Sequence, residues 1–518
     1  MSRPSRIVAA SSNWLAFAAA LAVAFFLTPH LIRSLGHARY DVWCVVEAIL
    51  AYFTLLDLGV GACLVRSAAR CHSTGDTDGL NRVASCSLAI FSVAGACALF
   101  IGVPLALLLA PKLGTRFNDP ADATAFMLVM LVNLAITLPL SVYPSMLDGL
   151  ERFAAKAAVR IVTLAIKATG YVWVTWEGES LLPLAIVSLV VTILENLTMA
   201  ILCRHFEPRL QFSKRFIDRE TLRAVRGYSG NAFLTMLAGR ITMQTGAVLI
   251  GVFLPTGQVT AFATAARLVD YAKTLLRTVT MTLMPGIAAM EAKGDWEGIR
   301  RLFLAGTRVV LYLVLPVNVG LILFGEPFLR RWVGSEVADG GYPAMVVLSL
   351  TLTLGVAQSM AGRVMYGLGQ LKWYARLALI EAAVNVVLTL VLIGPFGVLG
   401  VSIAVMVPNV LFCVITIAIA SRVVAATSRE YLSNCWKPFA ALTIPTAVWL
   451  AIGTVPAQWY QIFGAIGMGL APYVAGVMAL EWRAFRAPLR VAASLTSPIG
   501  IRIRSATRSA RPAVVSHS

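Results

Sequence analysis

The 518-residue sequence has a mean hydropathy of +0.80 and only 13% charged residues, which excludes a soluble globular protein and indicates a polytopic membrane protein. Its net charge of +18 is distributed over many short segments, so a membrane surface is favoured over nucleic acid as the partner of the basic residues. The eight cysteines lie mostly in apolar segments without paired spacing, and they are interpreted as core residues, not metal or redox sites.

Apolar runs of about 20 residues, separated by charged or Pro/Gly-containing breaks, predict fourteen membrane-spanning helices. The first run follows Arg3 and Arg6 and is longer than the apolar core of a cleaved signal peptide, so it is expected to remain as a span. The sequence therefore predicts an all-α fold. The predicted spans are 11–34, 42–66, 83–110, 122–147, 156–177, 181–203, 227–253, 259–287, 302–325, 343–366, 373–394, 397–421, 437–455 and 459–481.

The distribution of Lys and Arg predicts that both termini lie in the cytoplasm, because short cytoplasmic loops carry most of the basic residues. With the N-terminus inside, the inside segments hold 31 of the 43 basic residues, and the outside loops hold six. Losing one early span would destroy this asymmetry. An even number of spans is therefore expected.

The longest internal loop is strongly basic and separates the first six spans from the next six. At an offset of 218 residues, Ser11 and Asn13 align with Ser229 and Asn231 at the starts of two corresponding spans. This placement favours two similar six-helix lobes with a substrate path between them. The predicted organisation is an N-terminal lobe at 1–203, a basic cytoplasmic linker at 204–226, a C-terminal lobe at 227–421, two extra spans at 422–482 and a disordered basic cytoplasmic tail at 483–518.

No motif of covalent chemistry is present in the sequence. It has five histidines but no HExxH, Walker or Gly-x-Ser-x-Gly motif, and its outside loops are too short for a catalytic domain. We therefore expect neither an enzyme nor a bound cofactor or metal ion. The ionisable residues inside the spans become the candidate functional groups.

Four charges lie on one face of the eighth predicted span, although each costs roughly 2.5–3.5 kcal/mol at the bilayer centre. At 100° per residue, Arg267, Asp270, Lys273 and Arg277 fall within an arc of about 120°, so they are expected to line a polar path. On the preceding span, Arg240 is central and has no acidic neighbour on its own helix. It is the strongest candidate for a cavity cation.

Structural roles remain open for several of these charges. Arg267 and Arg277 can extend from the span to the two membrane interfaces. Asp270 can neutralise a cation three residues away, and Asp57 in LLDLGVG can cap a helix break at the following glycines. Lys167 is close enough to a helix end to be structural.

Cations outnumber anions on the polar face, which favours an anionic substrate. Arg guanidinium groups match phosphate oxygens in a bidentate geometry, whereas a cationic drug calls for a cavity dominated by carboxylates. The candidate substrate-binding cations are Arg240, Arg267, Lys273 and Arg277. The candidate counter-ions or ion-coupling groups are Asp57, Asp270 and Glu47.

The sequence resembles polysaccharide-biosynthesis flippases of the multidrug/oligosaccharidyl-lipid/polysaccharide superfamily in several stretches. The first, at 35–69, is LGHARYDVWCVVEAILAYFTLLDLGVGACLVRSAA, which has LG-x(3)-Y-x(2)-W and then D-L-G. The others are AARL at 265–268, MPGIAAMEAKGDWEGIRRLF at 284–303 and GLGQLKWYARLALIEAAVNVVLTLVLIGPFGVLGVSIA at 367–404. The resemblance covers about residues 8–425, and it departs from the family pattern at Asp41, where Gly is usual.

The resemblance implies a two-lobed bundle with a central cavity that opens alternately to the two sides of a bacterial inner membrane. Such proteins move a lipid-linked anionic glycan, an isoprenoid-diphosphate-linked oligosaccharide, to the outer leaflet for exopolysaccharide, capsule or O-antigen synthesis. The cavity positions carried over are Asp57, Arg240, Arg267 and Lys273. Membrane lipids are expected partners, a polysaccharide polymerase and glycosyltransferases are candidate partners, and coupling to an H+ or Na+ gradient is left open.

The sequence leaves three alternatives to this function open. One is a cation-coupled multidrug exporter of the same superfamily, which would give resistance to cationic dyes without a glycan phenotype. Another is a membrane glycan polymerase or ligase, which would form product from lipid-linked donors without transport. A scaffold for a synthesis complex would tolerate neutralisation of every cavity charge.

Overall fold

The computed structural model describes residues 3–219, 221–222, 230–281, 287, 290–291, 294–368, 371–452 and 458–481. These residues form helices and connecting turns without a strand, which confirms the predicted all-α fold. The first helices are α1 (Arg3–Phe53), α2 (Val60–Thr74), α3 (Thr77–Gly114), α4 (Pro120–Leu140), α5 (Val142–Gly149), α6 (Phe153–Glu177) and α7 (Leu182–Phe206). They are followed by α9 (Gly230–Phe253), α10 (Gln258–Met281), α12 (Trp296–Val333), α13 (Ser335–Gly367), α14 (Leu371–Val423), α15 (Ser428–Ile452) and α16 (Trp459–Leu480).

Two of the predicted connections between spans are single glycine turns. α1 contains the first predicted span and the beginning of the second, and it reverses at Gly36, whose φ is 71°. α14 contains the eleventh and twelfth and changes direction at Gly397, whose φ is 56°. Glycine adopts these left-handed conformations without the steric cost of a Cβ atom, so almost no loop is needed between the paired spans.

The second predicted span, 42–66, is not one continuous helix. α1 ends at Phe53, a 3-10 turn covers Thr54–Asp57, and α2 begins at Val60. Between them, Leu58 and Gly59 both have positive φ angles, of 51° and 79°. Two successive left-handed residues stop the helical hydrogen-bond ladder, so the prediction of an unbroken span is wrong here.

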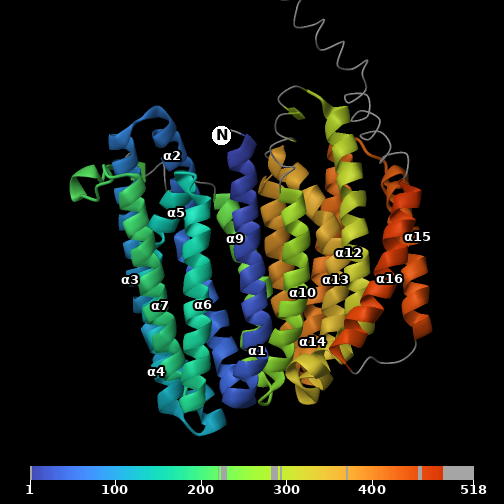
Figure 1. The fold of residues 1–518 in the computed structure, drawn as a ribbon, viewed down its shortest axis with the longest axis horizontal. Helices are drawn as coiled ribbons and strands as arrows, with labels where there is room; N and C mark the ends of the chain where they lie inside the picture. The colour runs from blue at the N-terminus through green and yellow to red at the C-terminus, as the bar shows by residue number, and fades with distance from the viewer. Residues whose placement is uncertain are drawn as a thin grey trace, which may run out of the picture.

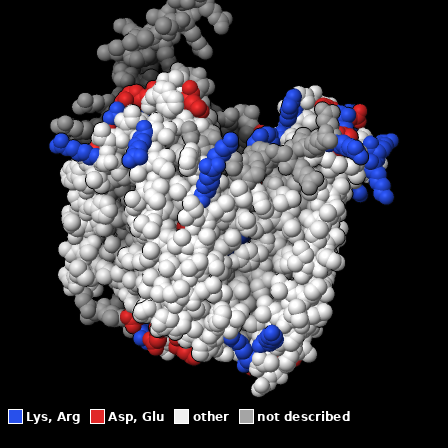
Figure 2. All heavy atoms as spheres, turned by 180° about the vertical axis from the view of Figure 1, so that it is seen from behind, with Lys and Arg blue, Asp and Glu red and all other residues white. Residues whose placement is uncertain are grey.

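The chain is a multi-pass membrane protein. Eleven helices among the described residues are long and apolar enough to cross a membrane. Of these, α14 contains two predicted spans, and α1 contains the first predicted span and the beginning of the second. The strongly charged α10 is not among the eleven. Figure 2 shows that Lys, Arg, Asp and Glu gather at the two ends of the face in view and leave a broad band almost without charge between them.

The helices pack as two groups that meet at α1 (Figure 1). The first helix group, α1 to α7, is held together by contacts of α3 with α4 and of α6 with α1 and α7. The second helix group, α9 to α14, is built around α13, which contacts α10, α12 and α14. α1 also contacts α9 and α10 of the second group, and α15 and α16 pack against α12.

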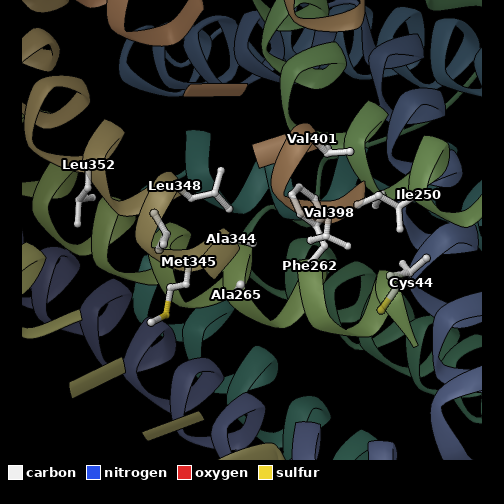
Figure 3. Packing of buried hydrophobic residues seen from close by; sticks show 14 of the residues in the cluster. Cys44, Ile250, Phe262, Ala265, Ala344, Met345, Leu348, Leu352, Val398 and Val401 are labelled. Carbon is white, nitrogen blue, oxygen red and sulfur yellow. The ribbon is translucent and has the colours of Figure 1, made fainter. Parts of the chain in front are cut away.

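A buried apolar cluster fixes α1 against the second helix group. Cys44 of α1, Ile250 of α9 and Phe262 of α10 lie in this cluster (Figure 3). A Cβ atom at Gly251 of α9 would lie only 2.4 Å from Val45 Cγ2 of α1, so the two helices approach closely at this glycine. This packing sets the position of the charged residues that follow Phe262 on α10.

Candidate functional site

An ion pair joins the two helix groups near the middle of α10. Arg267 NH2 lies 2.9 Å from Oε2 of Glu47 on α1, and Arg267 NH1 donates a 2.6 Å hydrogen bond to the hydroxyl of Tyr40. The side chains of Arg267 and Glu47 are 31% and 42% exposed, so neither is sealed in the core. Because Glu47 balances its charge inside the span, Arg267 does not need to extend to the membrane interface.

Two cavities meet at this ion pair. One, of about 230 Å³, lies between α1, α6 and α10, and Lys167 is among its lining residues. The other, of about 310 Å³, lies between α1, α9 and α10, and Asp270 is among its lining residues. Arg267 and Glu47 line both cavities. A group that entered either cavity would therefore meet the guanidinium of Arg267.

A further cavity of about 250 Å³ lies inside the second helix group, between α9, α10, α13 and α14. Asp270 and Lys273 line it from α10, and Glu381 and Asn409 line it from α14. Asn409 Nδ2 donates a 2.7 Å hydrogen bond to Glu381 Oε1. Two predicted site residues, Asp270 and Lys273, therefore face a space within one helix group, and Asp270 also lines the cavity at the ion pair.

A cavity of about 750 Å³ lies inside the first helix group, and no predicted substrate-binding residue lines it. It is bounded by α1, α2, α5, α6 and α7, and α6 contributes Lys156, Arg160 and Lys167 to its wall. Lys156 forms an ion pair with Asp148, and Arg160 Nε lies 3.9 Å from Oε1 of Glu195. The cavity is therefore polar and holds three cations and two carboxylates.

A second polar contact between the helix groups lies near the turn at Gly36. The carboxylate of Asp41, which is 1% exposed, accepts hydrogen bonds of 2.7 Å from the backbone N–H groups of Gly257 and Thr260 and of 2.6 Å from Thr260 Oγ1. It thereby satisfies N-terminal amides of α10, which begins at Gln258. The departure from the family pattern at Asp41 places a capping carboxylate across the interface between the groups.

Arg240 and Asp57, two other predicted site residues, lie in different surroundings. Arg240 is half-buried on α9, and its guanidinium has no hydrogen bond or ion pair with any group in the described part of the chain. Its neighbours Gly239 and Thr242 line the cavity of the second helix group. Asp57 Oδ1 accepts a 3.0 Å hydrogen bond from the N–H of Gly61, which caps the start of α2 after the helix break. The side chain of Arg277 lies outside the described residues.

Sequence reasoning missed two features of this region. It considers Asp270 as the partner of Arg267 or Lys273, whereas the structure pairs Arg267 with Glu47, and no local spacing indicates a contact between residues 220 positions apart. It also counts Lys156 and Arg160 with the cytoplasmic segments. Helical arithmetic places these two residues and Lys167 within an arc of about 40°, so the same test that identified the polar face of α10 would have found them.

Comparison with known proteins relates the chain to polysaccharide biosynthesis proteins. A family model described as "Polysaccharide biosynthesis protein" matches residues 31–340. The probable low-salt glycan biosynthesis flippase Agl15 of Haloferax volcanii is 24% identical over 182 residues, which cover 35% of this chain and 38% of Agl15. The uncharacterized membrane protein EpsK of Bacillus subtilis is 21% identical over 461 residues, which cover 85% of this chain and 88% of EpsK. The alignment with Agl15 thus spans well under half of that relative.

Solved structures share the fold at low sequence identity. The lipid II flippase MurJ, in an inward closed conformation, has a TM-score of 0.71 and 12% identity, and the match covers 92% of this chain and 100% of that one. An inward-facing multidrug resistance MATE family transporter of the MOP superfamily has a TM-score of 0.61 and 15% identity, with coverage of 77% and 94%. These matches show that the chain shares its overall helical fold with both proteins.

Proposed function

Because the chain belongs to the family of polysaccharide biosynthesis proteins, we propose that it flips isoprenoid-diphosphate-linked oligosaccharide units from the cytoplasmic to the outer leaflet of a bacterial inner membrane. The units would serve exopolysaccharide, capsule or O-antigen synthesis. Support comes from Agl15, a relative named as a probable flippase, and from the fold shared with a lipid II flippase. A polysaccharide polymerase and glycosyltransferases are the proposed partners before and after transport.

The observation that carries this proposal is the Arg267–Glu47 pair at the junction of two cavities and two helix groups. A guanidinium presents a planar set of N–H donors that matches two phosphate oxygens at once. With 31% of its side chain exposed, Arg267 can exchange the carboxylate of Glu47 for a diphosphate without first leaving a closed core. Arg240, Lys273 and Arg277 are proposed to add to the attraction for the anionic head group.

Transport is proposed to proceed by alternating access, with the two helix groups as the units that rock against each other. The contacts of Asp41 with α10 close the interface near Gly36, and the first half of α1 runs from that turn back to the N-terminus. If both termini are cytoplasmic, the structure is closed toward the outside. We propose Asp57, Asp270 and Glu47 as counter-ions or coupling groups for an H+ or Na+ gradient.

The test is a flipping measurement with purified protein in liposomes that contain a fluorescent polyisoprenyl-diphosphate oligosaccharide. Wild-type protein should expose the glycan of inner-leaflet lipid to an added glycosidase, and empty liposomes should not. Failure to move this lipid, together with export of cationic dyes by cells that express the protein, would support the multidrug exporter. Formation of longer glycans from two lipid-linked donors by the same preparation would support the polymerase or ligase.

A separate variant tests Arg240, because no contact in the described residues gives this side chain a structural role. Arg240→Ala is expected to lower the flipping rate about two- to fivefold, since one cation is removed from the approach to the cavity while the Arg267 site remains. The measurement is polymer export in cells with equal amounts of protein. Unchanged export would show that Arg240 is not a cavity contact.

A further inference from the structure

The cavity inside the first helix group contains cations that the proposed function does not use. We infer that Arg160 and Lys167 of α6 bind the diphosphate of the substrate there before it reaches the interface between the helix groups. This inference rests on the proposed function for the identity of the diphosphate carrier. The binding site itself is defined by α6 and its neighbours and has its own test.

The basic residues of α6 form a column on one face of the helix. At 100° per residue, Lys156, Arg160 and Lys167 lie at about 0°, 40° and 20°, and Thr163 lies at about 340°. Seven residues separate Arg160 from Lys167, which is a rise of about 10 Å along the helix. Long Arg and Lys side chains on one face can converge on a single ligand across such a distance, whereas cations on different faces cannot.

The three cations differ in how strongly their present partners hold them. Lys156 is engaged with Asp148, and its side chain is only 15% exposed. Arg160 meets Glu195 through Nε alone, at 3.9 Å, and its side chain is 60% exposed. A contact of this length and exposure contributes little to stability, so the guanidinium can turn to another anion.

Lys167 is the cation with the least compensation. Its Nζ lies 5.4 Å from the ring centroid of Tyr171, and no carboxylate lies within ion-pair distance of it in the described part of the chain. A cation–π contact supplies no negative charge, so the positive charge of Lys167 has no carboxylate that balances it directly. Lys167 and Arg160 therefore provide two positive charges for a ligand that carries two adjacent phosphates.

The carboxylates of the cavity limit what it can bind. Thr163 Oγ1 donates a 3.2 Å hydrogen bond to Oε2 of Glu195, while Glu195 Oε1 faces Arg160. A singly charged ligand would compete with Glu195 for one cation and gain little. A diphosphate offers more oxygens than Glu195 and can engage Arg160 and Lys167 together, which favours this class of ligand.

The position of Lys167 connects the two anion sites. Lys167, Leu164 and Ala20 line both the cavity of the first helix group and the 230 Å³ cavity that contains Arg267. None of the residues that line the larger cavity comes from the second helix group. A diphosphate held on α6 would thus be bound by one group only, and its transfer past Lys167 would bring it to the residues that join both groups.

The experiment is calorimetric titration of full-length protein in phosphatidylcholine nanodiscs with geranylgeranyl diphosphate and with inorganic diphosphate. Arg160→Gln/Lys167→Gln should weaken binding of both probes at least about tenfold, because two charge-assisted contacts are lost. Lys112→Gln, which removes an exposed cation at the end of α3, is the matched control and should leave the affinity within about twofold. Arg160→Gln alone tests the same site if the double variant does not fold, because Arg160 is largely exposed.

The outcomes of this titration test the site at Arg160 and Lys167 independently of the proposed function. Unchanged affinity in the Arg160 and Lys167 variants overturns the inference, even if the wild type flips lipid-linked glycan. Lost affinity in these variants supports it, even if no glycan is flipped and the proposed cargo is wrong. Binding that disappears when phosphatidylglycerol replaces phosphatidylcholine would assign the cations to phospholipid head groups and would also overturn it.

Discussion

The second half of α1, from Tyr40 to Phe53, packs against the two helix groups in different ways. Toward the first group, the ring of Trp43 lies 5.5 Å from that of Phe126 and 5.3 Å from that of Tyr171. Toward the second group, the contacts include the Arg267–Glu47 ion pair and the hydrogen bond between the Tyr52 and Thr245 hydroxyls, besides apolar packing at Cys44 and Val45.

We expect the aromatic contacts with the first helix group to be permanent and the polar contacts with the second group to be exchangeable. Aromatic packing is lost outright when two surfaces part, because a buried ring has no substitute partner of equal shape. Hydrogen bonds and ion pairs beside a cavity can be replaced by water or by a charged ligand at a small net free-energy change. The polar contacts of the second half of α1 with α9 and α10 are therefore expected to break and re-form, and the apolar packing at Cys44 and Val45 would have to part with them when the helix groups rock.

The largest expected effect comes from the aromatic side. Trp43→Ala removes a 4% exposed ring and should destabilise the protein by roughly 3–5 kcal/mol, because the cavity left between α1, α4 and α6 is not filled. Thermal denaturation in detergent measures it. Trp173→Ala on α6 is the matched control, since that ring is 63% exposed, and its effect should be much smaller. Equal losses in the two variants would contradict the assigned role of Trp43.

Arg267→Ala should have the next largest effect and should act on transport. The flipping rate is expected to fall more than about tenfold, because the substrate-facing guanidinium is lost and Glu47 is left without its cation. Arg267→Lys keeps the positive charge but loses the planar set of N–H donors that binds two phosphate oxygens, so the flipping rate should be intermediate. The measurement is the liposome flipping assay.

A double variant separates substrate binding from structure at this position. In Arg267→Ala/Glu47→Ala the unpaired carboxylate is gone, so the melting temperature should recover while the flipping rate stays low. Recovery of both would mean that Arg267 serves only to neutralise Glu47, and the proposed anion contact would then be abandoned.

The sequence predicts the helices well because hydrophobic runs and breaks are local properties. The predicted spans fall largely on helices, and the turn at Gly36 lies between the first two of them, as predicted. The clearest error is at Leu58–Gly59, where backbone conformation breaks the span predicted at 42–66. The pairing of Arg267 with Glu47 depends on how two distant helices meet, which periodicity within one helix does not contain. The alignment of Arg160 and Lys167 on one face of α6 could have been predicted from their spacing in the sequence.

A smaller effect is expected at the capped end of α10. Asp41→Asn removes the charge that accepts from the amides of Gly257 and Thr260 and should destabilise this contact by about 1–2 kcal/mol. Hydrogen exchange measured by mass spectrometry should then become faster at these amides. Asp295→Asn is the control, because Asp295 caps α12 through Gly298 within one segment and should change exchange only there. Unaltered exchange at Gly257 and Thr260 would show that the charge of Asp41 does not hold the two groups together.

Tyr52→Phe should give the smallest effect, since it removes one hydroxyl from the interface and leaves the ring in place. The hydrogen bond between Tyr52 Oη and Thr245 Oγ1 is 2.6 Å long and joins α1 to α9. Its loss should cost under about 1 kcal/mol in stability and change the flipping rate by less than about twofold, because both residues are only half-buried and water can replace either hydroxyl.

A double-mutant cycle with Thr245→Val sharpens this last prediction. The two residues should show a coupling energy of about 0.5–1 kcal/mol in thermal or denaturant unfolding. No coupling would mean that the hydroxyls do not bond in solution. A loss of flipping at normal stability in Tyr52→Phe alone would instead make Tyr52 a substrate contact, and the polar side of α1 would then bind the cargo in addition to joining the helix groups.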